Sequence, residues 1–109
     1  METTIQKNQY NVDGSREGYW EYYGVNDILL FKGNYLNGKQ NGYWEYYFDN
    51  GSLSYKGNYI NNNREGYWED YDINGNILYK GYFKNNIQVG YWEFYFNGGE
   101  IDTLEYFLY

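Results

Sequence analysis

The sequence predicts an all-β protein, in which successive β-hairpins form a single elongated, twisted antiparallel meander. Three observations predict this fold. The tetrapeptide Gly-Tyr-Trp-Glu recurs with its glycine at positions 18, 42, 66 and 90, always 24 residues apart. Strand-forming residues follow each copy with a period of two, and turn residues such as Asn50-Gly51 stand at a fixed offset. A fixed period of this length is typical of folds that stack one supersecondary unit on the next.

The period divides the chain of 109 residues, which is long enough for one domain. We expect an N-terminal half-repeat (5–17), three full repeats (18–41, 42–65 and 66–89) and a C-terminal capping repeat (90–109). The last repeat departs from the pattern, because Leu104-Glu105 replaces Lys-Gly and the chain closes on Tyr106-Phe-Leu-Tyr109. We interpret it as a cap. The alternative is that this apolar end lies on an edge strand to which another chain adds.

Each repeat is predicted to be one hairpin. In repeat 42–65, Asn50-Gly51 is the dipeptide favoured in a two-residue type I′ turn, in which both residues need positive φ. A second polar turn is expected at Asn61-Asn62, where the chain passes to the next hairpin. The corresponding hairpin turns hold Asn26-Asp27, Asn74-Gly75 and Gly98-Gly99, and the corresponding connecting turns hold Asn37-Gly38 and Asn85-Asn86.

The two-residue turn fixes a register. It places Trp44 opposite Gly57, Glu45 opposite Lys56, Tyr46 opposite Tyr55 and Phe48 opposite Leu53. The same count gives Trp20 with Gly33, Glu21 with Lys32, Trp68 with Gly81 and Glu69 with Lys80. Opposite charges therefore meet across each ladder, and each indole lies over a glycine that leaves room for it.

Alternation along the strands then predicts two faces. The expected core face carries Trp20, Trp44, Trp68 and Trp92; Leu29, Leu53, Ile77 and Ile101; Phe31, Tyr55 and Tyr79; and Tyr35, Tyr59, Phe83 and Phe107. The opposite, exposed face carries tyrosines and glutamates, with Lys32, Lys56 and Lys80 beside them.

Composition restricts the function. Aromatic residues make up 26% of the chain, 18 of them tyrosine, and the net charge is −7. Cysteine and histidine are absent, which excludes disulfides and thiolate chemistry and removes the commonest general base. The N-terminus has no apolar segment of a signal peptide and no long apolar run follows, so we expect a cytoplasmic protein. Residues 65–109 hold eight acids against Lys80 and Lys84. This charge favours solubility, with a basic partner as the functional alternative, and it disfavours direct binding of nucleic acid.

The sequence lacks the residues that a catalytic, calcium-binding, phosphate-binding or base-stacking site would need. The glutamate row could bring two carboxylates close, but most have an opposing lysine and a sheet face offers no cleft. Asp70, Asp72 and Asn74 alternate as in a calcium loop, yet no glutamate stands at the later position that such a loop needs. No glycine-rich phosphate loop is present, and glutamates interleave the tyrosines that could otherwise stack on bases. We therefore predict no enzyme, no catalytic residue, no cofactor and no metal.

The pattern Gly-x-Trp-x-x-Tyr-x-x-x-Gly-x-Leu-x-x-x-Gly-x-Tyr, with Asn-Gly-Lys-x-x-Gly-x-Trp read around Gly42, resembles the MORN-repeat-variant family, a bacterial branch of the MORN repeats often described as antitoxin-like. The resemblance covers about residues 5–107. It implies a long, twisted, open meander of hairpins and a role as an interaction scaffold. Association with lipid, which occurs in some MORN-type proteins, is disfavoured here by the acidity of the chain.

The leading hypothesis is a non-catalytic protein–protein interaction module, an acidic antitoxin- or inhibitor-like protein. It would bind and block a toxin or a nucleic-acid-processing defence enzyme, in a bacterium or in the host cytoplasm if a phage encodes it. The predicted partner-binding residues are Tyr19, Glu21, Tyr23, Tyr43, Glu45, Tyr47, Tyr67, Glu69, Tyr71, Tyr91, Glu93 and Tyr95. Two alternatives stay open. One is a structural scaffold that self-assembles or dimerises through an edge strand, and the other is an aromatic groove for a sugar or nucleotide.

Overall fold

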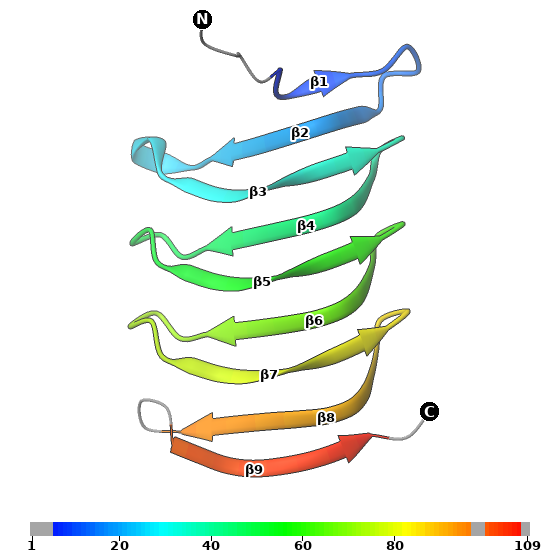
Figure 1. The fold of residues 1–109 in the computed structure, drawn as a ribbon. Helices are drawn as coiled ribbons and strands as arrows, with labels where there is room; N and C mark the ends of the chain where they lie inside the picture. The colour runs from blue at the N-terminus through cyan, green and yellow to red at the C-terminus, as the bar shows by residue number, and fades with distance from the viewer. Residues whose placement is uncertain (1–5, 97–99, 108–109) are drawn as a thin grey trace, which may run out of the picture.

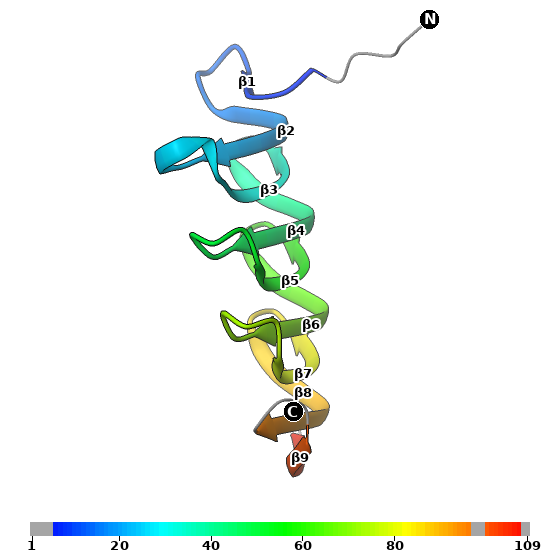
Figure 2. The ribbon, with the colours of Figure 1, turned by 90° about the vertical axis from the view of Figure 1, so that its left-hand side faces the viewer.

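The computed structural model describes residues 6–96 and 100–107, without the side chain of Asp102, and in this part nine strands form one open antiparallel sheet in chain order (Figure 1). The strands are β1 (Gln9–Tyr10), β2 (Arg16–Tyr23), β3 (Leu29–Leu36), β4 (Lys39–Tyr47), β5 (Leu53–Ile60), β6 (Asn63–Tyr71), β7 (Ile77–Lys84), β8 (Ile87–Phe96) and β9 (Glu100–Phe107), with a 3₁₀ turn η1 (Val25–Asp27) between β2 and β3. The predicted all-β meander of hairpins is confirmed. The sheet is 46 Å along its longest axis, and Figure 2 shows its curved strands from their ends.

The hairpin turn lies where the sequence placed it but is of another type. Asp49, Asn50 and Gly51 form a three-residue loop, closed by the Phe48 N–H donating to the Ser52 carbonyl at 2.8 Å. Only Gly51 has a positive φ, of 87°, so the predicted type I′ turn at Asn50-Gly51 is wrong. The Asn50 side chain accounts for the difference, because its Oδ1 accepts the N–H of Ser52 at 2.9 Å and stabilises the longer loop.

The other hairpin turns differ among themselves. Gly75 has φ of 90° in a loop closed by the Asp72 N–H donating to Asn76, as in the β4–β5 turn. Asn26 and Asp27 both have positive φ, within η1. Gly98-Gly99 lies outside the described residues. The two-residue type I′ pattern occurs instead at the predicted connecting turns, where both residues have positive φ: Asn37-Gly38, Asn61-Asn62 and Asn85-Asn86.

The register is confirmed in the centre of the ladders and wrong at one end. All the predicted tryptophan–glycine and glutamate–lysine pairs are present, as is the pair of Tyr46 with Tyr55. Phe48 does not pair with Leu53, however, because a bulge of one residue follows Tyr46 and brings Tyr47 opposite Leu53. The longer loop and the bulge cancel each other beyond this point, which is why the rest of the count holds.

The bulge recurs in every hairpin and moves the aliphatic row. It pairs Tyr23 with Leu29, Tyr47 with Leu53, Tyr71 with Ile77 and Tyr95 with Ile101. Directly paired residues share a face of the sheet. The four aliphatic residues therefore lie on the tyrosine side, and their predicted place in the tryptophan core is wrong.

Tryptophan forms the core, as predicted. Trp44, Trp68 and Trp92 are at most 1% exposed. Tyr59 and Phe83 are buried with them. The half-buried side chains that pack against this core are Phe31, Tyr35, Tyr46, Tyr55, Tyr79, Phe94 and Phe107. One face of the single sheet is thus a continuous aromatic layer, in which edge-to-face contacts join successive hairpins.

The indoles of Trp44, Trp68 and Trp92 each cover a glycine of the preceding hairpin rather than of their own. A Cβ built on Gly57 would lie 2.2 Å from the ring of Trp68, and the Trp68 indole N–H donates to the Asn58 carbonyl at 3.1 Å. In the same way Trp44 lies over Gly33 and Trp92 lies over Gly81, and each indole N–H donates to the carbonyl of the residue after that glycine. The expectation that Trp44 lies over Gly57 is therefore wrong, although the two residues pair in the ladder. Within residues 6–96 and 100–107, no helix has the length and apolar character needed to cross a membrane.

Candidate interaction surface

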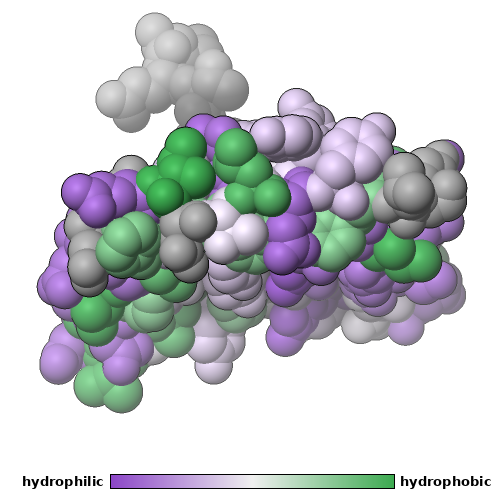
Figure 3. Space-filling model, turned by 90° about the horizontal axis from the view of Figure 1, so that it is seen from below, coloured by the Kyte–Doolittle hydropathy of each residue, from purple (hydrophilic) through white to green (hydrophobic). Residues whose placement is uncertain are grey.

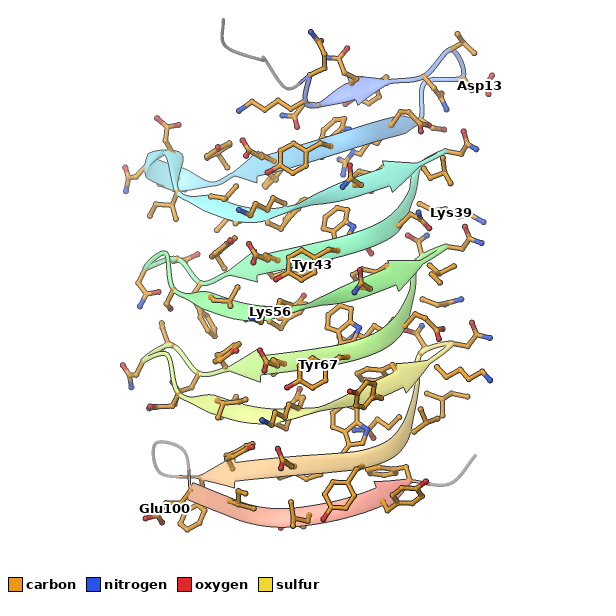
Figure 4. All side chains as sticks on the ribbon, in the orientation of Figure 1. Asp13, Lys39, Tyr43, Lys56, Tyr67 and Glu100 are labelled. Carbon is orange, nitrogen blue, oxygen red and sulfur yellow. The ribbon has the colours of Figure 1, made fainter. Side chains whose placement is uncertain are left out.

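The predicted binding residues lie together on one side of the sheet, which we call the tyrosine face. Strands β2, β4, β6 and β8 each contribute one Tyr-x-Glu-x-Tyr segment, so the face consists of Tyr19, Glu21, Tyr23, Tyr43, Glu45, Tyr47, Tyr67, Glu69, Tyr71, Tyr91, Glu93 and Tyr95. In Figure 4 the labelled Tyr43 and Tyr67 lie one above the other on the same side of the ribbon.

In β2, β4 and β6 both tyrosines bond the glutamate between them, and in β8 Tyr95 bonds Glu93 at 2.6 Å. The Tyr43 hydroxyl donates to one carboxylate oxygen of Glu45 at 2.8 Å, and the Tyr47 hydroxyl donates to the other. The triplets of β2 and β6 repeat this arrangement at 2.6–2.8 Å. Because residues two apart in a strand point to the same side, the sequence spacing alone brings these three groups together.

A lysine of the preceding hairpin completes each triplet. The ion pairs join Lys7 to Glu21 at 2.8 Å, Lys32 to Glu45 at 3.4 Å, Lys56 to Glu69 at 3.3 Å and Lys80 to Glu93 at 3.3 Å. Each lysine therefore bonds the glutamate of the following hairpin, not the one predicted within its own. Such partly exposed pairs contribute about 0–1 kcal/mol each, so they orient the side chains more than they stabilise the sheet.

These bonds fix the charge of the face. Lys7, then Tyr23 and Tyr19, hold the pKa of Glu21 down at about 2. Burial pulls the pKa of Glu45 upward, but hydrogen bonds from its tyrosines and Lys32 outweigh it and lower the value. Burial, followed by the bond to Glu45, raises the pKa of Tyr43. At neutral pH the face is thus a row of ionised carboxylates held by protonated phenols.

The face is not uniform along the molecule. Asn34 and Asn58 stand opposite Tyr19 and Tyr43, but tyrosines take this position in the last two hairpins, and Leu104 replaces the repeat's lysine. The resulting exposed cluster, the C-terminal patch, consists of Tyr67 (39% exposed), Tyr82 (51%), Tyr91 (53%), Leu104 (48%) and Tyr106 (66%). The sequence pattern already marked Leu104-Glu105 as a departure in the last repeat, but the tyrosines at positions 82 and 106, in place of the asparagines at 34 and 58, were not recognised there as part of one cluster.

The opposite, aromatic face holds an acid, Asp70, which the sequence indicated only as part of a calcium-like spacing. Asp70 stands where β2 and β4 have Tyr22 and Tyr46, and it accepts the Tyr79 hydroxyl at 2.8 Å. Burial raises the pKa of Asp70, although the bond from Tyr79 and the charge of Arg64 oppose this. Burial, with the bond to Asp70, raises the pKa of Tyr79 to about 12.

The calcium-like spacing of Asp70 and Asp72 does not bring them to one point. The Asp72 carboxylate accepts the backbone N–H groups of Asn74 and Asn76, both at 2.9 Å, in its own turn, whereas Asp70 bonds Tyr79 on the aromatic face. Among the described residues, no group of three or more acids, histidines or cysteines is arranged to hold a metal ion.

A hollow of about 430 Å³ opens beside η1, and the sequence analysis also missed it. Gly24 stands where other hairpins have Phe48 or Phe96, and Leu30 stands where β5 has Ser54. A Cβ on Gly24 would lie 2.7 Å from Leu30, so the glycine makes room for the leucine. The lining residues are Tyr22, Gly24, Val25, Asn26, Ile28, Leu30 and Asp49, a mostly apolar set.

Comparison of the chain with protein-family models finds no match, and comparison with curated proteins finds none.

Proposed function

We propose that this protein is a non-catalytic interaction module, an acidic antitoxin- or inhibitor-like protein that binds a partner protein through the tyrosine face and blocks it. The observation that carries the proposal is the repeated Tyr-Glu-Tyr triplet, in which hydrogen bonds hold two phenols and one carboxylate in place. Tyrosine provides large contact area at low entropic cost, and side chains that are already ordered lose less entropy on binding.

The charge of the chain supports a basic partner. The net charge is −7, and the low pKa values of Glu21, Glu45 and Glu69 keep the carboxylates of the face ionised. Each glutamate of the face is paired with a lysine, so the attraction comes from the net negative charge of the whole chain. This charge would draw the chain to the phosphate-binding groove of a nuclease or a similar toxin and speed encounter. Such a partner works in the cytoplasm, of a bacterium or of a phage host, and the proposal places the chain there.

One observation supports a non-catalytic role, and a second supports the proposed family. The glutamates are bonded by phenols and lysines, with pKa values shifted away from neutrality, which does not suit proton transfer near pH 7. The meander of hairpins with a 24-residue period is the architecture that the MORN-repeat-variant resemblance implies. We therefore include membership of that family in the proposal.

The test is an affinity capture of the partner, followed by binding with purified components. Changing Tyr43, Glu45 and Tyr47 together to serine removes one triplet and should weaken binding at least about tenfold, the loss expected for central aromatic anchors. The matched control changes Val12 and Asp13, exposed in the β1–β2 loop, to serine and removes the same charge. Equal binding by the wild type, the triple variant and the control would reject the tyrosine face as the binding surface, provided that circular dichroism shows all three folded.

The second candidate function is a self-assembling scaffold, which the open edge of β9 favours. Light scattering against concentration separates the two functions. A scaffold would grow in mass over the micromolar range, whereas an inhibitor that works as a single chain would stay monomeric.

A further inference from the structure

We propose that the partner binds at the C-terminal end of the sheet, where an extended basic segment of it adds to the free edge of β9 and packs against the C-terminal patch. This inference rests on the proposed function and names the part of the surface that performs it. Three independent observations lead to it: an open edge, a change in the repeat pattern, and the distribution of charge.

The edge of β9 is open along its whole length. β9 pairs with β8 on one side and has no strand of the described chain on the other, over eight residues. The opposite edge, β1, is only two residues long. Natural proteins usually protect such an edge with lysine, proline or a very short strand. Residues 100–107 contain neither lysine nor proline, so the unpaired backbone groups remain available to another strand.

The residues of β9 also do not fit the contacts that a further hairpin of the same repeat would need. Each internal hairpin provides a lysine for the next glutamate and a glycine for the next indole, as Lys56 and Gly57 do for Glu69 and Trp68. The corresponding residues of β9 are Leu104 and Glu105. A glutamate side chain would occupy the space that an indole needs, because even a Cβ at Gly57 would lie 2.2 Å from Trp68. A strand that adds here is therefore not a tryptophan-bearing strand of a second copy.

The C-terminal patch provides aromatic anchors beside this edge. Tyr91 and Tyr106 contact each other edge to face at 6.4 Å between ring centroids, and both are more than half exposed. Figure 3, which looks at the molecule from the β9 end, shows hydrophobic and weakly polar side chains gathered there beside hydrophilic ones. Exposed clusters of this kind mark interaction sites, and tyrosine is enriched among the residues that dominate binding energy.

Charge selects the kind of partner. Residues 100–107 include Glu100, Asp102 and Glu105 and no basic residue, and the side chains of Glu100 and Glu105 are exposed. Pairing of β9 with the β9 of a second copy would bring two such acidic strands together, at a cost in repulsion. A strand with alternating lysine or arginine would instead meet opposite charge.

The direct test uses a capped synthetic peptide of about eight residues, the length of β9, in which lysine alternates with valine. The same peptide with glutamate in place of lysine is the matched control. Titration of the ¹⁵N-labelled chain should shift amide signals of residues 100–107 and of β8 with the lysine peptide only. Absence of binding, equal binding of both peptides, or shifts spread over the tyrosine face without those of β9 would overturn the proposal.

Two variants taken from the chain's own repeats localise the binding. Tyr106→Asn installs the residue found at Asn34 and Asn58, and Leu104→Lys installs that of Lys56, so the sheet already accepts both residues at these positions. Tyr106→Asn should weaken the lysine peptide about tenfold or more, as the loss of an aromatic anchor does. Val12→Asn, at an exposed site in the β1–β2 loop at the opposite end of the sheet, should leave binding unchanged. An equal loss from Val12→Asn would contradict the location.

The captured natural partner separates this inference from the function on which it rests. If the partner is lost with the Tyr43, Glu45 and Tyr47 variant but retained by Leu104→Lys with Tyr106→Asn, the inhibitor function stands and the β9 site fails. If neither variant affects capture, the proposed function itself fails. If both variants lose the partner, both proposals are supported, whereas loss with the C-terminal variant alone supports the β9 site and rejects binding through the Tyr43, Glu45 and Tyr47 triplet.

Discussion

At the scale of single residues, the closest packing in the sheet is that of tryptophan on glycine. Trp44, Trp68 and Trp92 are buried although the protein is a single sheet, because each indole lies flat on a glycine of the preceding strand and donates its N–H to the carbonyl of the residue that follows this glycine. Here the glycines do not serve a special backbone conformation. They are needed because any side chain at that position would occupy the space of the ring.

This packing predicts a clear effect of Gly57→Ala. The added methyl group would lie 2.2 Å from the Trp68 ring, so the indole must move, and we expect a loss of about 1–3 kcal/mol in the free energy of unfolding. Urea unfolding monitored by tryptophan fluorescence measures it. The neighbouring exposed Asn58→Ala should change stability by no more than about 0.5 kcal/mol. Equal stability of the Gly57 variant and the wild type would contradict the close contact.

The half-buried carboxylate of Asp70 predicts a pH-dependent gain from Asp70→Asn. Burial raises the pKa of Asp70 above its ordinary 3.8, so the folded state is disfavoured as this group ionises and stability falls as pH rises through the raised pKa. Asparagine can still accept the bond from Tyr79 without a charge. The variant should therefore be more stable than the wild type at pH 7, and the difference should vanish well below pH 3.8. Chemical unfolding at several pH values checks this, and a destabilised variant at pH 7 would contradict it.

The sequence predicted which residues pair but not which way their side chains lean. Gly33 pairs with Trp20 on one side and Trp44 on the other, and Lys32 pairs in the same way with Glu21 and Glu45. Counting along a hairpin cannot choose between two identical neighbours. The direction in which the side chains point decides between them, and it brings Gly33 and Lys32 into contact with Trp44 and Glu45 of the following hairpin.

At the scale of elements, the connecting turns bind each hairpin to the one before it. The Asn62 N–H donates to the Gln40 carbonyl at 3.0 Å, and the Asn62 Oδ1 accepts the Gln40 N–H at 2.7 Å. Asn86 bonds Arg64 in the same way. An asparagine at this position therefore does two things: it adopts the positive φ of the turn and it pairs with the edge of the preceding turn.

Substitution of Asn62 separates these two contributions. Asn62→Gly retains the backbone freedom but loses the side-chain bond, whereas Asn62→Ala loses both at a φ of 70°. We expect losses of about 1 kcal/mol for glycine and about 2 kcal/mol for alanine. Thermal unfolding gives the order. If alanine proves as stable as asparagine, the turn conformation does not depend on this residue as described.

The elements themselves were predictable, and the details of their ends were not. Strand positions and the central register followed from the period and from the tryptophan–glycine and glutamate–lysine pairs. The type of the turn at Asn50-Gly51 did not, because the side-chain bond from Asn50 to Ser52 lengthens the loop and a bulge then absorbs the extra residue. Both effects are local and leave the ladder count unchanged, so the sequence pattern contains no sign of them.

At the scale of the whole molecule, the hairpins form a one-dimensional stack. Indoles, lysines and turn asparagines all reach the neighbouring hairpin, so each unit is stabilised by the contacts at its two ends. Each internal hairpin has a neighbour on both sides for these contacts, whereas the first and last strands have a neighbour on one side only, so their sequences can depart from the repeat. The residues of the tyrosine face were predicted from alternation alone. The C-terminal patch could not be predicted in this way, because it consists partly of residues that depart from the repeat, namely Tyr82, Leu104 and Tyr106.

The central claim is that this acidic protein binds a basic protein partner through its tyrosine face. The most direct test is calorimetric titration of the purified chain into candidate basic nucleases and toxins at about 50 mM and about 300 mM salt. We predict one-to-one binding to such a partner, with an affinity that falls at least about tenfold between the two conditions. Binding that does not change with salt would contradict the electrostatic part of the claim, and failure of every basic candidate to bind at low salt would contradict the claim itself.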